Sequence, residues 1–264
     1  MNIKKKLLSI IVNFILFTSL VIGNDALSIS NPSSANDKDR DNYLITHNTY
    51  YISYNDNLHI PNWVGWHVDI NDLSTGRYSG TFSIDPNIPS NWIRVSHKDY
   101  DNSGFDRGHL CPNADRNAHD LGKETFLTSN IVPQTPECNR GVWKYFEEYC
   151  RQIIADDKNI ELYVYAGIYG QSRTISKKNI CVPAYCWKVV IILPVGDNDL
   201  SRISTDTKTI AMWIPNTIDC NNVPFRSYVT TIRYIEKKTG YNFLENVNVE
   251  IQDIIENTTY SFDE

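Results

Sequence analysis

Short runs of β-branched and aromatic residues recur through the middle of the chain and predict β-strands. The clearest runs cover residues 63–68, 162–166, 185–193 and 209–214. They are the dominant pattern along the chain. Any fold predicted from this sequence must therefore contain a substantial sheet.

Two segments carry a helical pattern instead. In residues 141–155 apolar side chains recur at steps of three and four, which indicates a helix with one buried stripe. Residues 224–238 are a second candidate helix, with Pro224 in its first turn. Because the few helices do not alternate regularly with the strands, the pattern favours an α+β fold over a doubly wound α/β fold.

The N-terminus has a different character. Three lysines at positions 4–6 precede an apolar run that extends to Gly23, and the first acidic residue is Asp25. This is typical of a secretory signal peptide, with cleavage expected after Gly23. An uncleaved membrane anchor is the alternative, although the run is shorter and more polar than the ~20 apolar residues that a spanning helix needs.

The remaining organisation follows from that interpretation. Residues 24–41 are rich in Ser, Asn and Asp and are expected to form a flexible polar leader, while residues 42–264 form one domain. The mature protein is predicted to be secreted or periplasmic, with no stable membrane association after cleavage. The sequence predicts no particular oligomeric state.

Composition and charge narrow the function. With 41% hydrophobic and 21% charged residues, the chain is neither disordered nor fibrous. Removing residues 1–23 takes away three lysines and no acidic residue, so the net charge changes from −6 to −9. A general basic coat for nucleic acid is excluded, and any nucleic-acid site must be a local basic patch on an acidic body.

Six cysteines lie in the predicted mature part, and an even number in an exported chain suggests disulfide bonds. The sequence alone does not select a pairing. Structural zinc is the competing interpretation, but no C-x2-C pair is present and no His lies close to Cys181 or Cys186.

The densest polar signal is the DRGH segment at residues 106–109. Histidine is the side chain best suited to exchange a proton near neutral pH, and Gly108 permits a close approach of the backbone. Further along stand Asn130, Asn139 and Glu147. Taken singly, Asn130 could be a turn residue and Asn139 a helix N-cap, and the other five histidines are interpreted as packed or surface residues.

Taken together, these residues resemble the DNA/RNA non-specific endonucleases of the ββα-metal superfamily. The family's DRGH segment is followed by an SN…PQ segment, which here is SNIVPQ at residues 129–134. It then has N-x-x-x-W with a glutamate in the following helix, here Asn139, Trp143 and Glu147. The three motifs stand in the family's order at compatible spacings. The resemblance implies a central, mainly antiparallel sheet with flanking helices.

Weaker similarity extends the resemblance to about residues 43–240. Segments 61–64, 182–188 and 214–216 look like an early strand, a later strand and a segment near the end of the family's domain. The chain also departs from the family pattern at three positions without losing a catalytic group: Cys111, Asn113 and Cys138. Cys138 directly precedes the expected metal ligand, which suggests a disulfide that braces the site.

The resemblance implies hydrolysis of DNA and RNA phosphodiesters with little sequence choice, with His109 as general base and Asn130 positioning the histidine or the phosphate. A hard cation, Mg²⁺ or else Mn²⁺ or another divalent ion, prefers oxygen ligands and keeps several waters, so Asn139 can be its only direct protein contact. On a continuous helix Glu147 would lie roughly 80° around and up to ~12 Å along from Asn139. Glu147 is therefore expected to act through metal-bound water, and a solvent-facing glutamate is its alternative.

A cation for the scissile phosphate is also expected. Arg77 stands where the family keeps such an arginine and is preferred, with Arg107 as the alternative. Arg107 and Arg116 flank His109 and are predicted to bind substrate, although Arg107 could instead pair with a nearby carboxylate. Two rival functions remain. One is a nucleic-acid-binding homologue without activity, against which the complete motif set argues. The other is a different secreted metal-dependent phosphoesterase, which would need more carboxylate or histidine ligands than the cluster provides.

Overall fold

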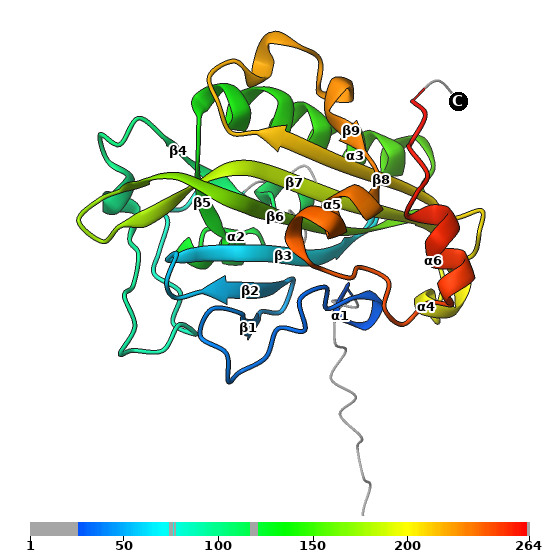
Figure 1. Ribbon diagram of the computed structural model, residues 1–264, viewed down its shortest axis with the longest axis horizontal. Helices are drawn as coiled ribbons and strands as arrows, with labels where there is room; N and C mark the ends of the chain where they lie inside the picture. The colour runs from blue at the N-terminus through cyan, green and yellow to red at the C-terminus, as the bar shows by residue number, and fades with distance from the viewer. Residues whose placement is uncertain (1–25, 74–75, 77, 117–120, 263–264) are drawn as a thin grey trace, which may run out of the picture.

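A seven-stranded antiparallel sheet forms the centre of the protein in a computed structural model that describes residues 26–73, 76, 78–116 and 121–262 (Figure 1). Its strand order is β1-β2-β3-β6-β7-β8-β9. The strands are β1 (Tyr43–Thr46), β2 (Tyr51–Asn55), β3 (Ile60–Val68), β6 (Ile160–Ile175), β7 (Ile180–Pro194), β8 (Lys208–Pro215) and β9 (Val229–Thr230). Each of the four predicted strands lies inside one of these elements, namely β3, β6, β7 and β8.

The predicted functional motifs lie on a small second unit. β4 (Asp106–His109) pairs antiparallel with β5 (Ile131–Gln134), so that His109 lies opposite Ile131. The helix α3 (Lys144–Asp156) follows and packs beside them. Two strands and a helix in this order form the ββα arrangement, and the α+β fold class is confirmed.

Short helical segments connect these elements and cover the sheet. They are α1 (Ala26–Ile29), η1 (His97–Tyr100), η2 (Asn113–Asp115), α2 (Gly122–Thr125), η4 (Thr128–Asn130), η5 (Cys138–Trp143), α4 (Asp199–Arg202), η6 (Cys220–Asn222), η7 (Phe225–Tyr228), α5 (Ile232–Thr239) and α6 (Val249–Ile255). None of the helices in the described ranges is long and apolar enough to cross a membrane.

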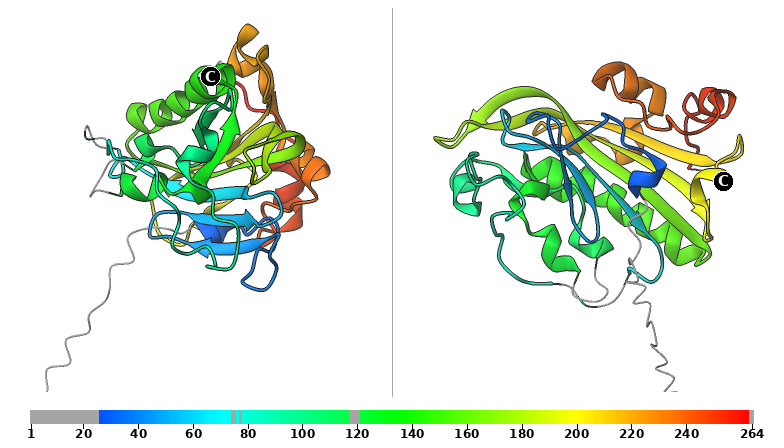
Figure 2. Two further views of the ribbon diagram at one scale, coloured as in Figure 1. Left: turned by 90° about the vertical axis from the view of Figure 1, so that its left-hand side faces the viewer. Right: turned by 90° about the horizontal axis from the view of Figure 1, so that it is seen from below.

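Each face of the sheet is covered by its own hydrophobic core, because successive strand residues point to opposite faces. On the face beneath α3, Trp66, Trp143 and Phe146 belong to the larger core. On the other face, Trp187 and Phe243 belong to a second core near α1, α5 and α6. Figure 2 shows α3 and the pair α5 and α6 on opposite sides of the sheet. The catalytic motifs therefore occupy one face only.

The first predicted helix begins later than expected. Gly141 has φ −105° and ψ −114°, which interrupts the helix, and the regular helix α3 starts at Lys144 rather than at residue 141. A Cβ atom at position 141 would lie 2.5 Å from Oδ1 of Asn221. The loop that carries Asn221 therefore packs against the backbone here, and only glycine leaves room for it.

The second predicted helix is also wrong at its start. Residues 225–230 form η7 and the short strand β9, and the helix α5 begins at Ile232. Thr231 caps it, since its Oγ1 accepts a hydrogen bond of 3.1 Å from the backbone N–H of Tyr234.

The structure describes residues 26–41 of the predicted flexible leader. These residues pack against the domain instead of forming a flexible segment. Ala26 and Ile29 are fully buried in the second core. Trp63 donates a hydrogen bond of 2.8 Å from Nε1 to Oγ of Ser33, and Tyr165 donates its hydroxyl to the carbonyl of Ala26. This segment is therefore part of the domain. The predicted signal peptide, residues 1–23, lies outside the described residues.

Candidate active site

The predicted catalytic residues meet at a pocket of about 210 Å³ where β4, η5 and α3 come together. His109, Asn139 and Glu147 all line it. The remaining lining residues are Pro112, Asn113, Ala114, Lys144, Glu148 and Arg151. A larger hollow of about 690 Å³ lies near α1, α4 and α6, but no histidine lines it, so we assign the chemistry to the smaller pocket.

His109 packs against two aromatic rings that also contact each other, with 4.9 Å between their centroids. The ring centroids of Phe82 and Phe126 lie 5.3 Å and 5.0 Å from that of the imidazole, and Trp143 Nε1 donates a 3.1 Å hydrogen bond to the His109 carbonyl. Burial lowers the pKa of His109 to about 4, so the ring is neutral at pH 7. Its Nε2 has no hydrogen-bond partner in the described part of the chain. This is a neutral imidazole with proton-accepting capacity to spare.

Gly108 lets the catalytic strand approach its neighbour. A Cβ atom there would lie 2.1 Å from Oε1 of Gln134, the residue that ends β5. Glycine is therefore required by the close packing of β4 on β5, which sets the position of His109.

Asn130 positions the chain around His109 and is not available to a phosphate. The side chain is fully buried, and its Oδ1 accepts a 2.9 Å hydrogen bond from the Cys111 backbone N–H. Its Nδ2 donates to the carbonyls of Cys111 and Thr125, both at 2.9 Å. The sequence suggested that Asn130 positions either the histidine or the phosphate. Its contacts favour the first role, in which it holds the segment that carries His109.

Asp106 fixes the side chain of Asn139. Asn139 Nδ2 donates a 3.0 Å hydrogen bond to Oδ2 of Asp106, and Arg140 pairs with both carboxylate oxygens at 2.7 Å and 2.6 Å. Burial opposes ionisation of Asp106, but the hydrogen bonds from Arg140 and Asn139 outweigh it and lower the pKa. With Nδ2 engaged, the carbonyl oxygen Oδ1 of Asn139 has no partner among the described residues and can accept a cation.

Glu147 is a buried carboxylate rather than a solvent-facing one. Its side chain is 11% exposed, and Oε1 lies 3.3 Å from Nζ of Lys188. Burial raises the pKa of Glu147, and the positive charge of Lys188 opposes that rise. The kink at Gly141 removes the continuous helix on which the predicted separation of Glu147 from Asn139 was based, and both residues line the same pocket.

Lys188 contacts the site through Glu147, and the sequence analysis did not single it out. It is 1% exposed in β7, and its Nζ lies 4.1 Å from the ring centroid of Trp143 and 5.6 Å from that of Trp66. A buried lysine is stable only with such partners. A lysine within the apolar run of residues 185–193 was the available signal.

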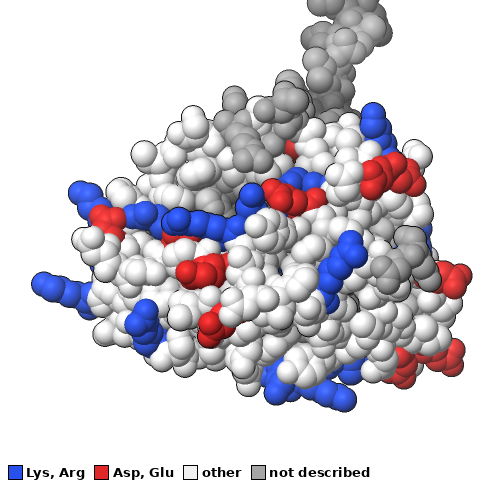
Figure 3. Space-filling model, turned by 90° about the horizontal axis from the view of Figure 1, so that it is seen from above, with Lys and Arg blue, Asp and Glu red and all other residues white. Residues whose placement is uncertain are grey.

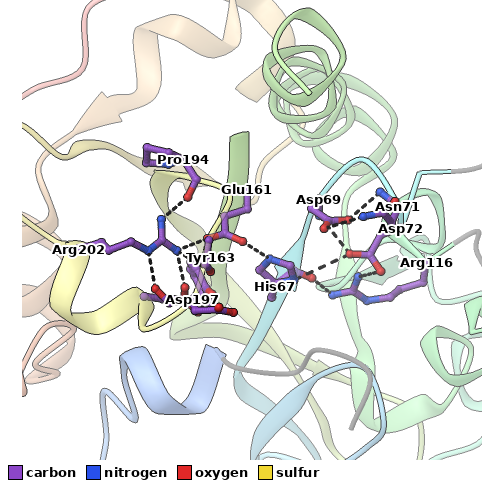
Figure 4. A network of polar contacts seen from close by, with 12 residues as sticks. His67, Asp69, Asn71, Asp72, Arg116, Glu161, Tyr163, Pro194, Asp197 and Arg202 are labelled. Carbon is purple, nitrogen blue, oxygen red and sulfur yellow. Dashed lines mark hydrogen bonds and ion pairs between the residues drawn. The ribbon is translucent and has the colours of Figure 1, made fainter. Parts of the chain in front are cut away.

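Arg116 is not a substrate-binding residue in this structure. Its side chain is 1% exposed, and Nη1 lies 3.2 Å from Oδ1 of Asp72. The guanidinium also donates to the carbonyls of Asp115 and His67, and Figure 4 shows it directed into this interior network. Because the Arg116 side chain is buried and engaged by these partners, it is not available to a substrate phosphate, and that prediction is wrong.

The other two predicted arginines have different outcomes. Arg107 donates from Nε and Nη2 to the carbonyl of His97, at 3.0 Å and 2.8 Å, and pairs with Asp101. It ties β4 to η1, and 30% of its side chain is exposed. Arg77, predicted for the scissile phosphate, lies outside the described residues.

Three cations in or beside the pocket were missed from the sequence: Lys144 and Arg151 line it, and Arg140 pairs with Asp106 next to it. Arg140 and Lys144 are 72% and 54% exposed. Lys144 and Arg151 stand three residues before and four residues after Glu147 on α3, a spacing that places them on its face of the helix. Figure 3 shows basic and acidic side chains interspersed over one face of the molecule, which matches local cations on an acidic body.

We expect the Lys188–Glu147 pair to stabilise the fold. Lys188→Met leaves a buried carboxylate without its partner and should lower the free energy of unfolding by about 3 kcal/mol. Because Glu147→Gln removes that charge, the double variant should be less destabilised than the sum of the two single variants. Chemical denaturation measures all of them, with the exposed Lys237→Met as the matched control. Additive losses would contradict the coupling.

Known proteins are similar to this chain over most of its length. Residues 29–250 match the family model of the DNA/RNA non-specific endonucleases. A nuclease of Nostoc sp. is 38% identical over 233 residues, covering 87% of this chain and 84% of that protein. Nuclease C1 of Cunninghamella echinulata is 29% identical over 240 residues, covering 84% and 88%.

The fold has a solved counterpart. A crystal structure of endonuclease G in complex with the inhibitor EndoGI superposes with a TM-score of 0.69 at 22% identity, covering 83% of this chain and 92% of that one. This likeness supports the ββα-metal fold, which the DRGH, SNIVPQ and N-x-x-x-W motifs predicted. The family match over residues 29–250 and the Nostoc relative together show that the chain belongs to the DNA/RNA non-specific endonuclease family.

Proposed function

We propose that this protein is an exported, divalent-metal-dependent endonuclease that hydrolyses DNA and RNA with His109 as general base. The observation that carries the proposal is one pocket lined by His109, Asn139 and Glu147, in which the imidazole is neutral at pH 7. A neutral histidine beside an amide oxygen and a buried carboxylate suits the activation of water for attack on phosphorus.

The donor set at the pocket fits a hard cation held mainly by water. Among the described residues no three His, Cys, Asp or Glu side chains cluster to hold a metal ion, but Asn139 offers one oriented oxygen. Mg²⁺ binds in this way, with one or two protein oxygens and several retained waters. When bound, such a cation supplies positive charge for the phosphorane and a polarised water for the leaving oxygen.

The chain's own groups have separate tasks in this mechanism. His109 accepts the proton of the attacking water, and its ring is kept in place by Phe82, Phe126 and the hydrogen bond from Trp143. Asp106 fixes the side chain of Asn139, whose Oδ1 would hold the cation. Glu147, which Lys188 holds by an ion pair, accepts hydrogen bonds from water in the pocket.

The exposed cations explain the breadth of the proposed substrate range. Arg140, Lys144 and the partly exposed Arg107 can contact backbone phosphates, which are the same for every base sequence. Binding through phosphates should also weaken steeply with added salt. The proposal therefore covers both DNA and RNA.

The deciding experiment uses purified residues 24–264 on supercoiled plasmid and on single-stranded RNA, with Mg²⁺ and with a chelator. We expect metal-dependent nicking of the plasmid and fragmentation of the RNA. Binding without cleavage would identify an inactive homologue, and release of phosphate only from monoesters would identify another phosphoesterase.

Export is supported by the lysines at positions 4–6 and the apolar run that follows. Ala26, which is buried in the second core, lies after the expected cleavage site, so cleavage after Gly23 would leave it in place. We expect intact-mass measurement of the protein from its natural compartment to show a chain that begins near Asn24. A retained N-terminus would contradict export by cleavage.

The pH dependence should report the burial of His109. Its pKa is about 4 in the folded protein against ~6.5 in an unfolded chain. The acidic limb of kcat/KM should therefore lie near pH 4, because only below that pH is most of the imidazole protonated and unable to accept a proton. The contribution of His109 to the free energy of unfolding is complete above pH ~6.5 and is lost as the pH falls toward 4. The reason is that, in this pH range, His109 is protonated in the unfolded chain but not in the folded protein. An acidic limb near pH 6.5 would contradict a buried, neutral base.

A further inference from the structure

Three buried thiols gather directly beneath the segment that carries Asn139. Cys138 lies in η5, Cys186 in β7 and Cys220 in η6, and none is more than 1% exposed. The side chains of Cys186 and Cys220 both lie in hydrogen-bonding contact with that of Cys138. All six cysteines of the chain carry free thiols in the structure.

The segments of Cys138 and Cys220 are already held together by other bonds. The backbone N–H of Thr135 donates a 2.8 Å hydrogen bond to Oδ1 of Asn216, and Oγ1 of Thr135 donates a 3.1 Å hydrogen bond to the carbonyl of Thr217. The same Oγ1 accepts from the Cys138 backbone N–H at 3.2 Å. Oxidation of the two thiols would therefore join segments that need little rearrangement.

Cys186 is the less suitable partner for Cys138. It lies in a strand paired on both sides, opposite Ile168 in β6 and Ile214 in β8. Its Sγ also accepts a 3.5 Å hydrogen bond from Nε2 of Gln134, the residue against which Gly108 packs. Moving this sulfur would disturb the support of the DRGH strand.

Cys220 lies in a segment that can open. Its neighbours are at the surface, with Ile218 69% exposed and Asn221 and Asn222 also exposed. A short 3-10 turn flanked by exposed residues opens locally at much lower cost than an interior strand. A small oxidant can reach Cys220 during such an opening, although the thiol is buried in the closed form.

We propose that Cys138 and Cys220 form a reversible disulfide that fastens the Asn139 segment to the loop of residues 217–223. The functional part of this inference rests on the proposed role of Asn139 as metal ligand. Asn139 follows Cys138 directly, and its backbone N–H donates a 2.9 Å hydrogen bond to the carbonyl of Thr135. The crosslink would hold this turn, and with it the amide oxygen, in the conformation described above.

The oxidant is a low-molecular-weight disulfide such as oxidised glutathione. The Cys220 thiolate attacks one sulfur of that disulfide, whose S–S bond breaks and releases one small thiol. The Cys138 thiolate then attacks Sγ of Cys220 in the mixed disulfide and releases the second small thiol. Two electrons pass from the protein to the small disulfide, and the two cysteine protons end on the two released thiols.

The test equilibrates the whole mature chain in glutathione buffers from fully reduced to fully oxidised and maps disulfides by peptide mass analysis under non-reducing conditions. We expect a peptide pair that links Cys138 to Cys220, reversible on reduction. Cys220→Ser should lack it, while Cys181→Ser, an equally buried control, should keep it. A Cys138–Cys186 link, glutathione adducts alone, or six free thiols in the oxidised buffer would each overturn the pairing.

Amide hydrogen exchange of the same samples tests the consequence. Oxidation should slow exchange in residues 135–141 and 217–223 by about tenfold or more in the wild type and leave Cys220→Ser unchanged. Equal exchange in oxidised and reduced wild type would overturn the bracing role. Neither measurement depends on nuclease activity, so failure of the disulfide and failure of the proposed function are separate results.

Discussion

Replacing His109 with alanine is expected to lower kcat on DNA and RNA by at least about 10²–10⁴-fold, the range typical of lost general-base catalysis. The reason is that the neutral imidazole, with Nε2 unpartnered among the described residues, is the proton acceptor of the pocket. The described carboxylates near the imidazole are already engaged, since Glu147 is paired with Lys188, Asp106 with Arg140 and Glu148 with Lys144.

The control for this variant must separate chemistry from folding. His109→Ala removes the ring that packs against Phe82 and Phe126, so its unfolding midpoint is measured together with its rate. His97→Ala removes a partly buried histidine that does not line the pocket and should keep the rate near that of the wild type. A folded His109→Ala enzyme with near-normal turnover would refute the assignment.

The fold could be predicted where the sequence carries a local signal. The strand runs at 63–68, 162–166, 185–193 and 209–214 contain the β-branched and aromatic residues that suit a pleated, buried surface, and each lies in a strand. The ends of the helices could not be predicted as well from local sequence. The start of α3 is set by Asn221, which lies far along the chain from Gly141 and packs against it.

Long-range pairing also explains the errors at the site. Arg116 stands close to His109 in sequence, but Asp72 and the carbonyl of His67 hold its guanidinium inside the protein. Nothing local to Arg116 distinguishes this from a surface position. Conversely, Lys188 reaches Glu147 only because β7 passes beneath α3, which no spacing within one segment reveals.

The N-terminal segment shows a third reason why a prediction from sequence can fail. Residues 26–41 have a polar composition, and the buried members, Ala26, Ile29 and Ala35, are isolated in it. Such a segment has too little apolar surface to indicate packing by itself. It is ordered because the second face of the sheet offers Trp63 and Tyr165 as hydrogen-bond donors to its polar atoms.

Asn139→Ala is expected to have the largest effect on metal dependence, since Asn139 Oδ1 is the oxygen that we propose as the direct ligand of the cation. The Mg²⁺ concentration for half-maximal activity should rise by more than about 100-fold, beyond the ~10–100-fold typical of residues that act through a ligand or its water. Glu147→Ala should fall in that smaller range. Glu147→Gln, which keeps hydrogen-bonding capacity, should be milder still. The loss of activity in each of these variants should become smaller in excess metal if it arises from lower occupancy of the metal site.

The ion pair of Glu147 with Lys188 gives this ranking its physical basis. A carboxylate that bound the cation directly would bring it close to the buried ammonium of Lys188, 3.3 Å from Oε1, where like charges repel. A retained water between Glu147 and the cation increases that separation while preserving the hydrogen bond. Binding of Mn²⁺ measured by calorimetry checks the ranking without using activity. A metal-bound crystal structure with the Glu147 carboxylate in direct contact with the ion, or with two ions in the pocket, would refute the arrangement.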